Sequence, residues 1–182
     1  GPNEFMMHGY QIWVALPKEL EEMAPRFDYF SGSEIPSWEE KGLLLKLVAG
    51  NAFGKSAPLQ GYSPLFMVDI YAEKKTTLNL RGQLIGEVAF VIVKGGINES
   101  AERVEAGQML ISKTDEACEI HLDAGTQVLL FGGEPLPEER YLLWNFVSHR
   151  KDRLKQAKQD WKDKKFPTVP DDKTYIPIPD ML

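Results

Sequence analysis

Short runs of alternating apolar and polar residues recur along most of the chain, and turns rich in glycine separate them. The runs contain the β-branched and aromatic residues that favour strands. The alternation predicts strands over residues 10–16, 43–49, 66–72, 76–80, 87–93, 108–112, 118–122, 127–131 and 141–147. Because no helical pattern interrupts the series from residue 43 to residue 147, we expect a mainly β fold of the sandwich or barrel type.

Alternation also predicts which side chains fill the interior of this fold. Successive side chains of a strand point to opposite faces, so every second residue shares a face. The apolar rows expected to line the interior are Phe66/Val68/Ile70, Val88/Phe90/Ile92 and Val128/Leu130.

A helical pattern replaces the alternation after residue 148. Ser148 is of a type that caps helices, and Leu154, Ala157 and Trp161 recur at three- and four-residue spacing. These features predict a helix over residues 149–166 with one apolar face. The proline-containing remainder, residues 167–182, is expected to lie extended over a surface or to be mobile.

Composition and charge narrow the function classes. The 182 residues are 43% hydrophobic and 10% aromatic, as in a globular core, and no run is long enough to span a membrane. The net charge of −6 argues against direct binding to nucleic acid or to a membrane. One cysteine, Cys118, and no export signal predict a cytoplasmic protein with a buried thiol. Residues 1–5 are interpreted as a tag remnant.

The strand expected at residues 118–122 carries the best candidate for metal chemistry. Glu119, His121 and Asp123 share one face, and a carboxylate–imidazole–carboxylate row could bind a divalent ion. A polar row that faces water, opposite an apolar row that faces the core, explains the same residues. The sequence contains no His-x-His, Cys-x-x-Cys or Gly-x-Ser-x-Gly motif. No catalytic or cofactor-binding residue is therefore assigned.

Several longer stretches resemble the pirin family of two-barrel cupins. They are Gly-Gly-Glu-Pro-Leu from Gly132, Tyr-Leu-Leu-Trp-Asn-Phe-Val-Ser from Tyr141, Lys151 to Trp161, Phe166-Pro, and His-Gly-Tyr-Gln-Ile-Trp-Val-Ala-Leu-Pro from His8. The resemblance implies a cupin-type antiparallel β-barrel or jelly roll with a carboxy-terminal helix. Residues 6–30 would match the end of the amino-terminal barrel. Residues 31–148 would form the carboxy-terminal barrel, 149–166 the helix and 167–182 the tail.

The resemblance also implies where the family holds Fe(II). Its ligands are three histidines and a glutamate of the amino-terminal barrel, in a His-x-His pair and a His-x-Glu pair that precede the segment matching His8. The sequence contains neither pair, so we expect no iron in this chain although full-length members bind it. Without that barrel an apolar surface would be uncovered and the chain would self-associate, by exchange of the Tyr10 strand or of the helix. The expected interface residues are Tyr10, Ile12, Trp13, Trp144, Phe146 and Trp161.

Three functional hypotheses follow from the resemblance. The parent protein could be an iron-dependent dioxygenase of the quercetin-cleaving type, and this chain its non-catalytic half. It could instead be a redox-sensing regulator that binds transcription factors or metabolic enzymes, for which this half supplies contact surface. The alternative is a stand-alone cupin domain that binds a small apolar ligand in its barrel.

Overall fold

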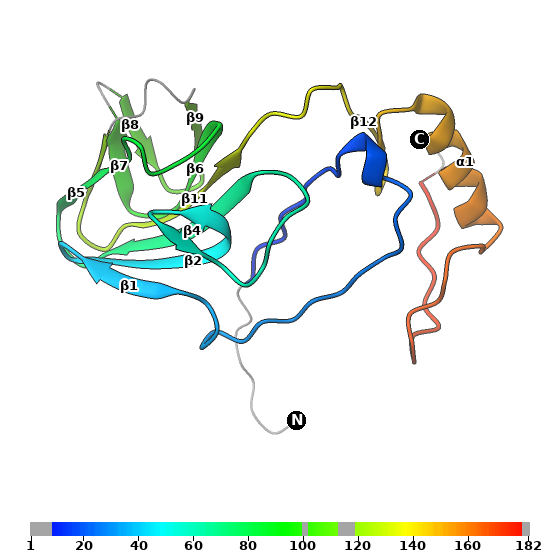
Figure 1. The fold of residues 1–182 in the computed structure, drawn as a ribbon, viewed down its shortest axis with the longest axis horizontal. Coiled ribbons are helices and arrows are strands. Elements are labelled where there is room, and N and C mark those ends of the chain that lie inside the picture. The colour runs from blue at the N-terminus through cyan, green and yellow to red at the C-terminus, as the bar shows by residue number, and fades with distance from the viewer. Residues whose placement is uncertain (1–8, 100–101, 113–118, 180–182) are drawn as a thin grey trace. The chain divides into compact units, whose positions relative to one another are not determined.

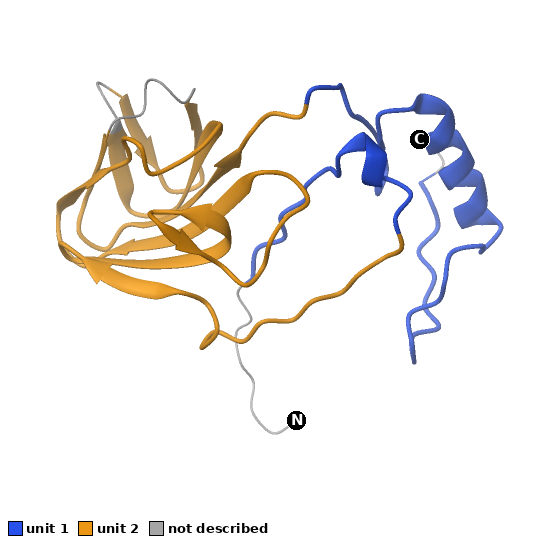
Figure 2. Cartoon of the chain, viewed as in Figure 1, with its two compact units in different colours: residues 1–23, 137–182 blue, residues 24–136 orange. Residues whose placement is uncertain are grey.

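The computed structural model describes residues 9–99, 102–112 and 119–179. The chain divides into two compact units, which Figure 2 distinguishes by colour. Unit 2 contains residues 24–136, and unit 1 combines residues 1–23 with residues 137–182. The expected tag remnant at residues 1–5 and the lone Cys118 lie outside the described residues.

Unit 2 is built from antiparallel strands (Figure 1). One sheet has the strand order β1-β2-β4-β11-β6-β9, with β3 paired to β2, and the other has the order β5-β10-β7-β8. The first sheet contains β1 (Ser37–Glu40), β2 (Leu43–Ala52), β3 (Lys55–Ser56), β4 (Leu65–Ala72), β6 (Glu87–Lys94), β9 (Met109–Ser112) and β11 (Gln127–Gly133). The second contains β5 (Thr76–Asn79), β7 (Gly96–Glu99), β8 (Glu102–Glu105) and β10 (Glu119–Leu122).

The core of unit 2 is formed by the apolar rows that alternation predicted. Every residue of the three predicted rows is buried, with exposed fractions from 0% to 3%. Leu45, Leu47 and Ile120 complete the same core from neighbouring strands. Burial of this apolar surface is the main term that stabilises the unit, at about 25 cal/mol per Å².

One glycine in β2 is required by close approach of the backbone. Gly50 has a φ of +69°, and a Cβ built on it would lie 1.7 Å from the carbonyl oxygen of Leu65 on β4. The pairing of β2 with β4 shifts register just before it, between Leu47 and Ala49. The strand extends to Ala52, three residues beyond the predicted end.

Unit 1 contains η1 (Lys18–Leu20), β12 (Tyr141–Leu143), β13 (Phe146–Ser148) and α1 (Lys151–Lys162). The single strand expected over residues 141–147 is wrong, because the chain reverses at Trp144, whose φ is 51°, and forms the β12–β13 hairpin. The strand expected over residues 10–16 is also absent from the described structure. That segment has no strand assignment although its sequence alternates.

The helix begins two residues later than predicted. The Ser148 Oγ accepts a hydrogen bond from the Arg150 N–H at 3.0 Å, but Arg150 itself is the residue before the first helical turn. Leu154 and Ala157 are buried, as their spacing predicted. No helix within residues 9–99, 102–112 and 119–179 is long and apolar enough to cross a membrane.

The chain after α1 lies extended against the helix. The Trp161 indole N–H donates a hydrogen bond to the Ile176 carbonyl oxygen at 2.9 Å, and the Trp161 and Tyr175 rings stack at 5.7 Å. Ile178 is only 8% exposed. Of the two predicted alternatives for the tail, the extended one describes residues up to 178.

Candidate functional site

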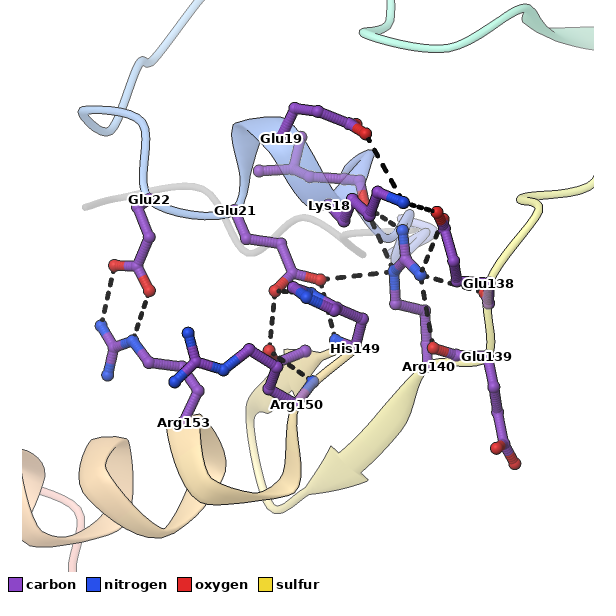
Figure 3. Close-up of polar contacts among 12 residues, drawn as sticks. Lys18, Glu19, Glu21, Glu22, Glu138, Glu139, Arg140, His149, Arg150 and Arg153 are labelled. Atoms are coloured by element: carbon purple, nitrogen blue, oxygen red, sulfur yellow. Dashed lines mark hydrogen bonds and ion pairs between the residues drawn. The ribbon is translucent and has the colours of Figure 1, made fainter.

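A buried carboxylate joins the two sequence-distant parts of unit 1. Glu21 follows η1, as Figure 3 shows. Its side chain is 10% exposed. It accepts hydrogen bonds from the Ser148 O–H at 2.7 Å and from the His149 main-chain N–H at 2.9 Å. The His149 Nδ1 lies 2.9 Å from the same carboxylate. The amino-terminal segment is thereby fixed to the end of β13.

Arg140 supports this carboxylate from the chain just before β12. Its side chain is 11% exposed, and its Nε lies 3.4 Å from Glu21 Oε1. The guanidinium also donates hydrogen bonds to the carbonyl oxygens of Leu16 and Glu138, each at 3.0 Å. We call Glu21, Arg140, Ser148 and His149 the carboxylate cluster. It satisfies its polar groups internally, which is what buried charges require.

Hydrogen bonding keeps Glu21 ionised despite its burial. Loss of water raises the pKa of a buried carboxyl, but the hydrogen bonds from Ser148 and His149 together outweigh that effect. The pKa of Glu21 is therefore lowered from its ordinary value of 4.5. The Glu21 carboxylate is therefore charged at neutral pH.

Two ion pairs extend the carboxylate cluster toward solvent. Lys18 on η1 pairs with Glu138, and this hydrogen bond raises the pKa of Lys18 and lowers the pKa of Glu138. Glu22 accepts two hydrogen bonds from the Arg153 guanidinium on α1, at 2.5 and 3.1 Å. Both pairs again connect residues 18–22 with the chain after residue 137.

A groove of about 540 Å³ lies beside the carboxylate cluster within unit 1. Residues 13–16 form one side, and residues of the β12–β13 hairpin form the other. Trp13 is 53% exposed, Val14 60% and Leu142 66%. The groove thus combines apolar walls with a polar end made by Glu21 and Arg140.

The structure separates the six predicted interface residues into two groups. Tyr10, Ile12 and Trp13 are between 42% and 53% exposed and lie in the extended segment. The other three, on the β12–β13 hairpin and α1, pack together as an aromatic cluster. In this aromatic cluster the ring centres lie 5.5 Å apart for Trp144–Phe146, 5.1 Å for Trp144–Trp161 and 6.4 Å for Phe146–Trp161.

Two residues of the predicted row, His121 and Asp123, contact side chains of other strands. His121 Nε2 lies 3.6 Å from Glu119 Oε1, but its Nδ1 is hydrogen-bonded to the Thr77 hydroxyl at 2.8 Å. Asp123 is held by the Arg103 guanidinium at 2.5 Å. Among the described residues, no three His, Cys, Asp or Glu side chains are grouped as metal ligands. The row offers one imidazole and two carboxylates, and so lacks the three histidines of the Fe(II) centre that the resemblance implies for the amino-terminal barrel.

Sequence reasoning missed the carboxylate cluster. Glu21 and Arg140 are separated by more than a hundred residues, and neither stands in a recognisable motif. The sequence feature that could have indicated the cluster is the charged stretch Lys-Glu-Leu-Glu-Glu directly after Pro17. Such a stretch is as typical of a short capped turn as of a binding site.

Comparison with known proteins places the chain in a family. The family described as "Pirin C-terminal cupin domain" matches residues 67–167, which is more than half of the chain. The chain belongs to the pirin family. Together with the antiparallel sheets and the carboxy-terminal helix α1, this match confirms the predicted cupin-type fold.

Individual relatives support the pirin assignment. A pirin-like protein from Caulobacter vibrioides is 39% identical over 96% of this chain. A crystal structure of quercetin 2,3-dioxygenase from Acinetobacter baumannii superposes with a TM-score of 0.81 at 28% identity and covers 92% of this chain. A second structure with the same name and organism gives a TM-score of 0.71 at 25% identity, over 86% of this chain.

These similar proteins are longer than this chain. The chain spans 60% of the Caulobacter protein and 56% of each Acinetobacter chain. It is thus related to cupins of the quercetin 2,3-dioxygenase type, and it matches the pirin C-terminal cupin domain in particular.

Proposed function

We propose that this chain is the non-catalytic half of a pirin-type cupin protein, a scaffold whose exposed apolar segment binds another polypeptide. The observation that carries the proposal is the solvent exposure of apolar side chains in the segment of residues 10–14. Tyr10, Ile12, Trp13 and Val14 are each more than 40% exposed, although their sequence is that of a buried strand.

The backbone of this segment supports the same proposal. Within the described structure, no main-chain hydrogen bond joins residues 11–15 to another segment. The main-chain N–H and C=O groups of residues 11–15 are therefore suited to pair with a strand of a second polypeptide. In the isolated chain that polypeptide is a second copy, which makes the chain self-associate.

The core of unit 2 supports the non-catalytic part of the proposal. Leu47, Val68 and Leu130, from three adjacent strands, are each 0% exposed and point into one hydrocarbon interior. An Fe(II) centre inside a barrel needs nitrogen and oxygen ligands at that place. The interior of unit 2 supplies packing instead.

Sedimentation velocity over a wide range of protein concentration tests the proposal. The wild-type chain should associate, Trp13→Asp should shift it toward monomer, and Phe27→Asp should associate like the wild type. Phe27 is the matched control because it is 90% exposed but lies in unit 2, outside the segment. A wild-type chain that stays monomeric at all concentrations would refute the contact function, and turnover of a flavonol by this chain alone would refute the non-catalytic role.

A further inference from the structure

Unit 2 contains a cavity that the proposed contact function does not use. It encloses about 340 Å³, which falls within the roughly 300–1,000 Å³ of small-molecule sites. Its lining comes from β1, β2, β3 and β5 and from the turns beside them; Figure 1 labels β1, β2 and β5. Leu43 and Leu78 contribute a buried apolar floor.

An aromatic wall forms one side of the cavity. Trp38 on β1 and Phe53 after β2 contact each other with ring centres 5.9 Å apart and planes at 54°. Both side chains are only half-buried, so part of each ring remains free to contact a ligand. Rings arranged in this way favour the flat face of an aromatic molecule.

The charge of the lining favours an anion. The Lys55 ammonium lies 5.1 Å from the centre of the Trp38 ring, and no carboxylate among the described residues pairs with it. Lys41 also lines the cavity and is 3.9 Å from Glu40, which is the one carboxylate of the lining. One positive charge, that of Lys55, is therefore left without a counterion.

Backbone strain at the cavity is a separate observation that points to a function. Phe53 has a φ of 51° in the two-residue turn, Phe53-Gly54, between β2 and β3. Asparagine suits the first position of such a turn far better than a bulky aromatic residue. The Phe53 N–H donates to the Gln83 carbonyl oxygen at 3.2 Å, which fixes the turn. Strain that is kept in a cavity wall is typical of binding sites.

We propose that this cavity binds a small planar aromatic anion of the aryl carboxylate class. The rings of Trp38 and Phe53 contact the aromatic face, and the Lys55 ammonium pairs with the carboxylate. Asn79 and Gln83, which also line the cavity, offer hydrogen bonds to polar substituents of the ring.

Calorimetric titration with 2-naphthoate tests this proposal on the whole chain. The expected result is saturable binding at one site per chain, weakened about tenfold by Lys55→Gln. Lys46→Gln is the matched control, since Lys46 is exposed on β2 and does not line the cavity. The neutral analogue 2-naphthylmethanol should bind more weakly than 2-naphthoate.

A second variant tests the role of the strained turn. Phe53→Asn suits the left-handed backbone and removes the ring, so the protein should keep its strand signals in the NMR spectrum while its affinity for 2-naphthoate falls. The proposal is overturned if 2-naphthoate shows no saturable binding, or if Lys55→Gln and Lys46→Gln bind it equally well. It is also overturned if folded Phe53→Asn binds it as tightly as the wild type does.

Discussion

Replacement of Glu21 by glutamine should loosen unit 1 and leave unit 2 unchanged. The variant keeps the size of the side chain but replaces an ionised acceptor of two hydrogen bonds, at 2.7 and 2.9 Å, with a neutral amide. A hydrogen bond to a charged group contributes about 1.5–3 kcal/mol, and one between neutral groups about 0.5–1.5. The amide also places a donor among the donors of Arg140 and His149. We therefore expect a loss of about 2–4 kcal/mol.

Hydrogen exchange can measure this loss in each unit separately. Amide protons of the β12–β13 hairpin and of α1 should exchange roughly 30- to 1,000-fold faster in Glu21→Gln, whereas amides of β4 and β11 should keep their protection. Glu22→Gln is the matched control, because Glu22 is 67% exposed and its pair with Arg153 should contribute less than about 1 kcal/mol. Equal effects of the two variants, or unchanged exchange in α1, would refute the role given to the carboxylate cluster.

The pH dependence of stability provides a second test of the role of Glu21. The pKa of Glu21 is lowered in the folded protein, so its contribution to stability is fully present above 4.5, its ordinary value. That contribution is lost as the pH falls through the lower folded pKa. The difference in protection between wild type and Glu21→Gln should therefore be largest at neutral pH and shrink as the carboxyl is protonated. A difference that grows on acidification would contradict the assignment.

Two further predictions concern the backbone of β2 and the tail. In urea unfolding, Gly50→Ala should lower the free energy of unfolding by clearly more than Gly54→Ala does. Both glycines have a positive φ, which costs alanine about 1–2 kcal/mol. Of the two sites, only Gly50 would place the new Cβ against a carbonyl oxygen. Equal losses would show that steric contact is unimportant there. Trp161→Ala removes the hydrogen bond and the ring stacking that hold the tail, so trypsin should cleave after Lys173 faster. Val169→Ala is the control: the Val169 side chain is 67% exposed, so its removal should leave the cleavage rate unchanged.

The fold was predictable from the sequence where burial alternates strictly. Rows such as Phe66/Val68/Ile70 have one face in the core, and period-two alternation is the direct consequence of that geometry. The short strands β1 and β8 were missed because they are polar and mostly exposed, as the sequence Ser-Trp-Glu-Glu of β1 illustrates. In these strands pairing with neighbours, and not local pattern, decides the structure.

The unit boundary and the site depend on contacts that no local pattern contains. The segment of residues 10–16 alternates like a strand, but a strand needs a second strand beside it, and among the described residues no strand pairs with this segment. Residues 137–148 belong to unit 1 together with residues 1–23, which are far from them in the sequence. Glu21 and Arg140 come together only because chain segments more than a hundred residues apart meet there.

The most direct test is an anaerobic titration of the purified chain with Fe(II), followed by elemental analysis. It tests the claim that this half contributes contact surface and not a reaction centre. The account predicts no stoichiometric iron after removal of unbound metal. One iron per chain that is retained by the wild type and lost in His121→Ala would contradict it, because this polypeptide would then hold a metal centre of its own.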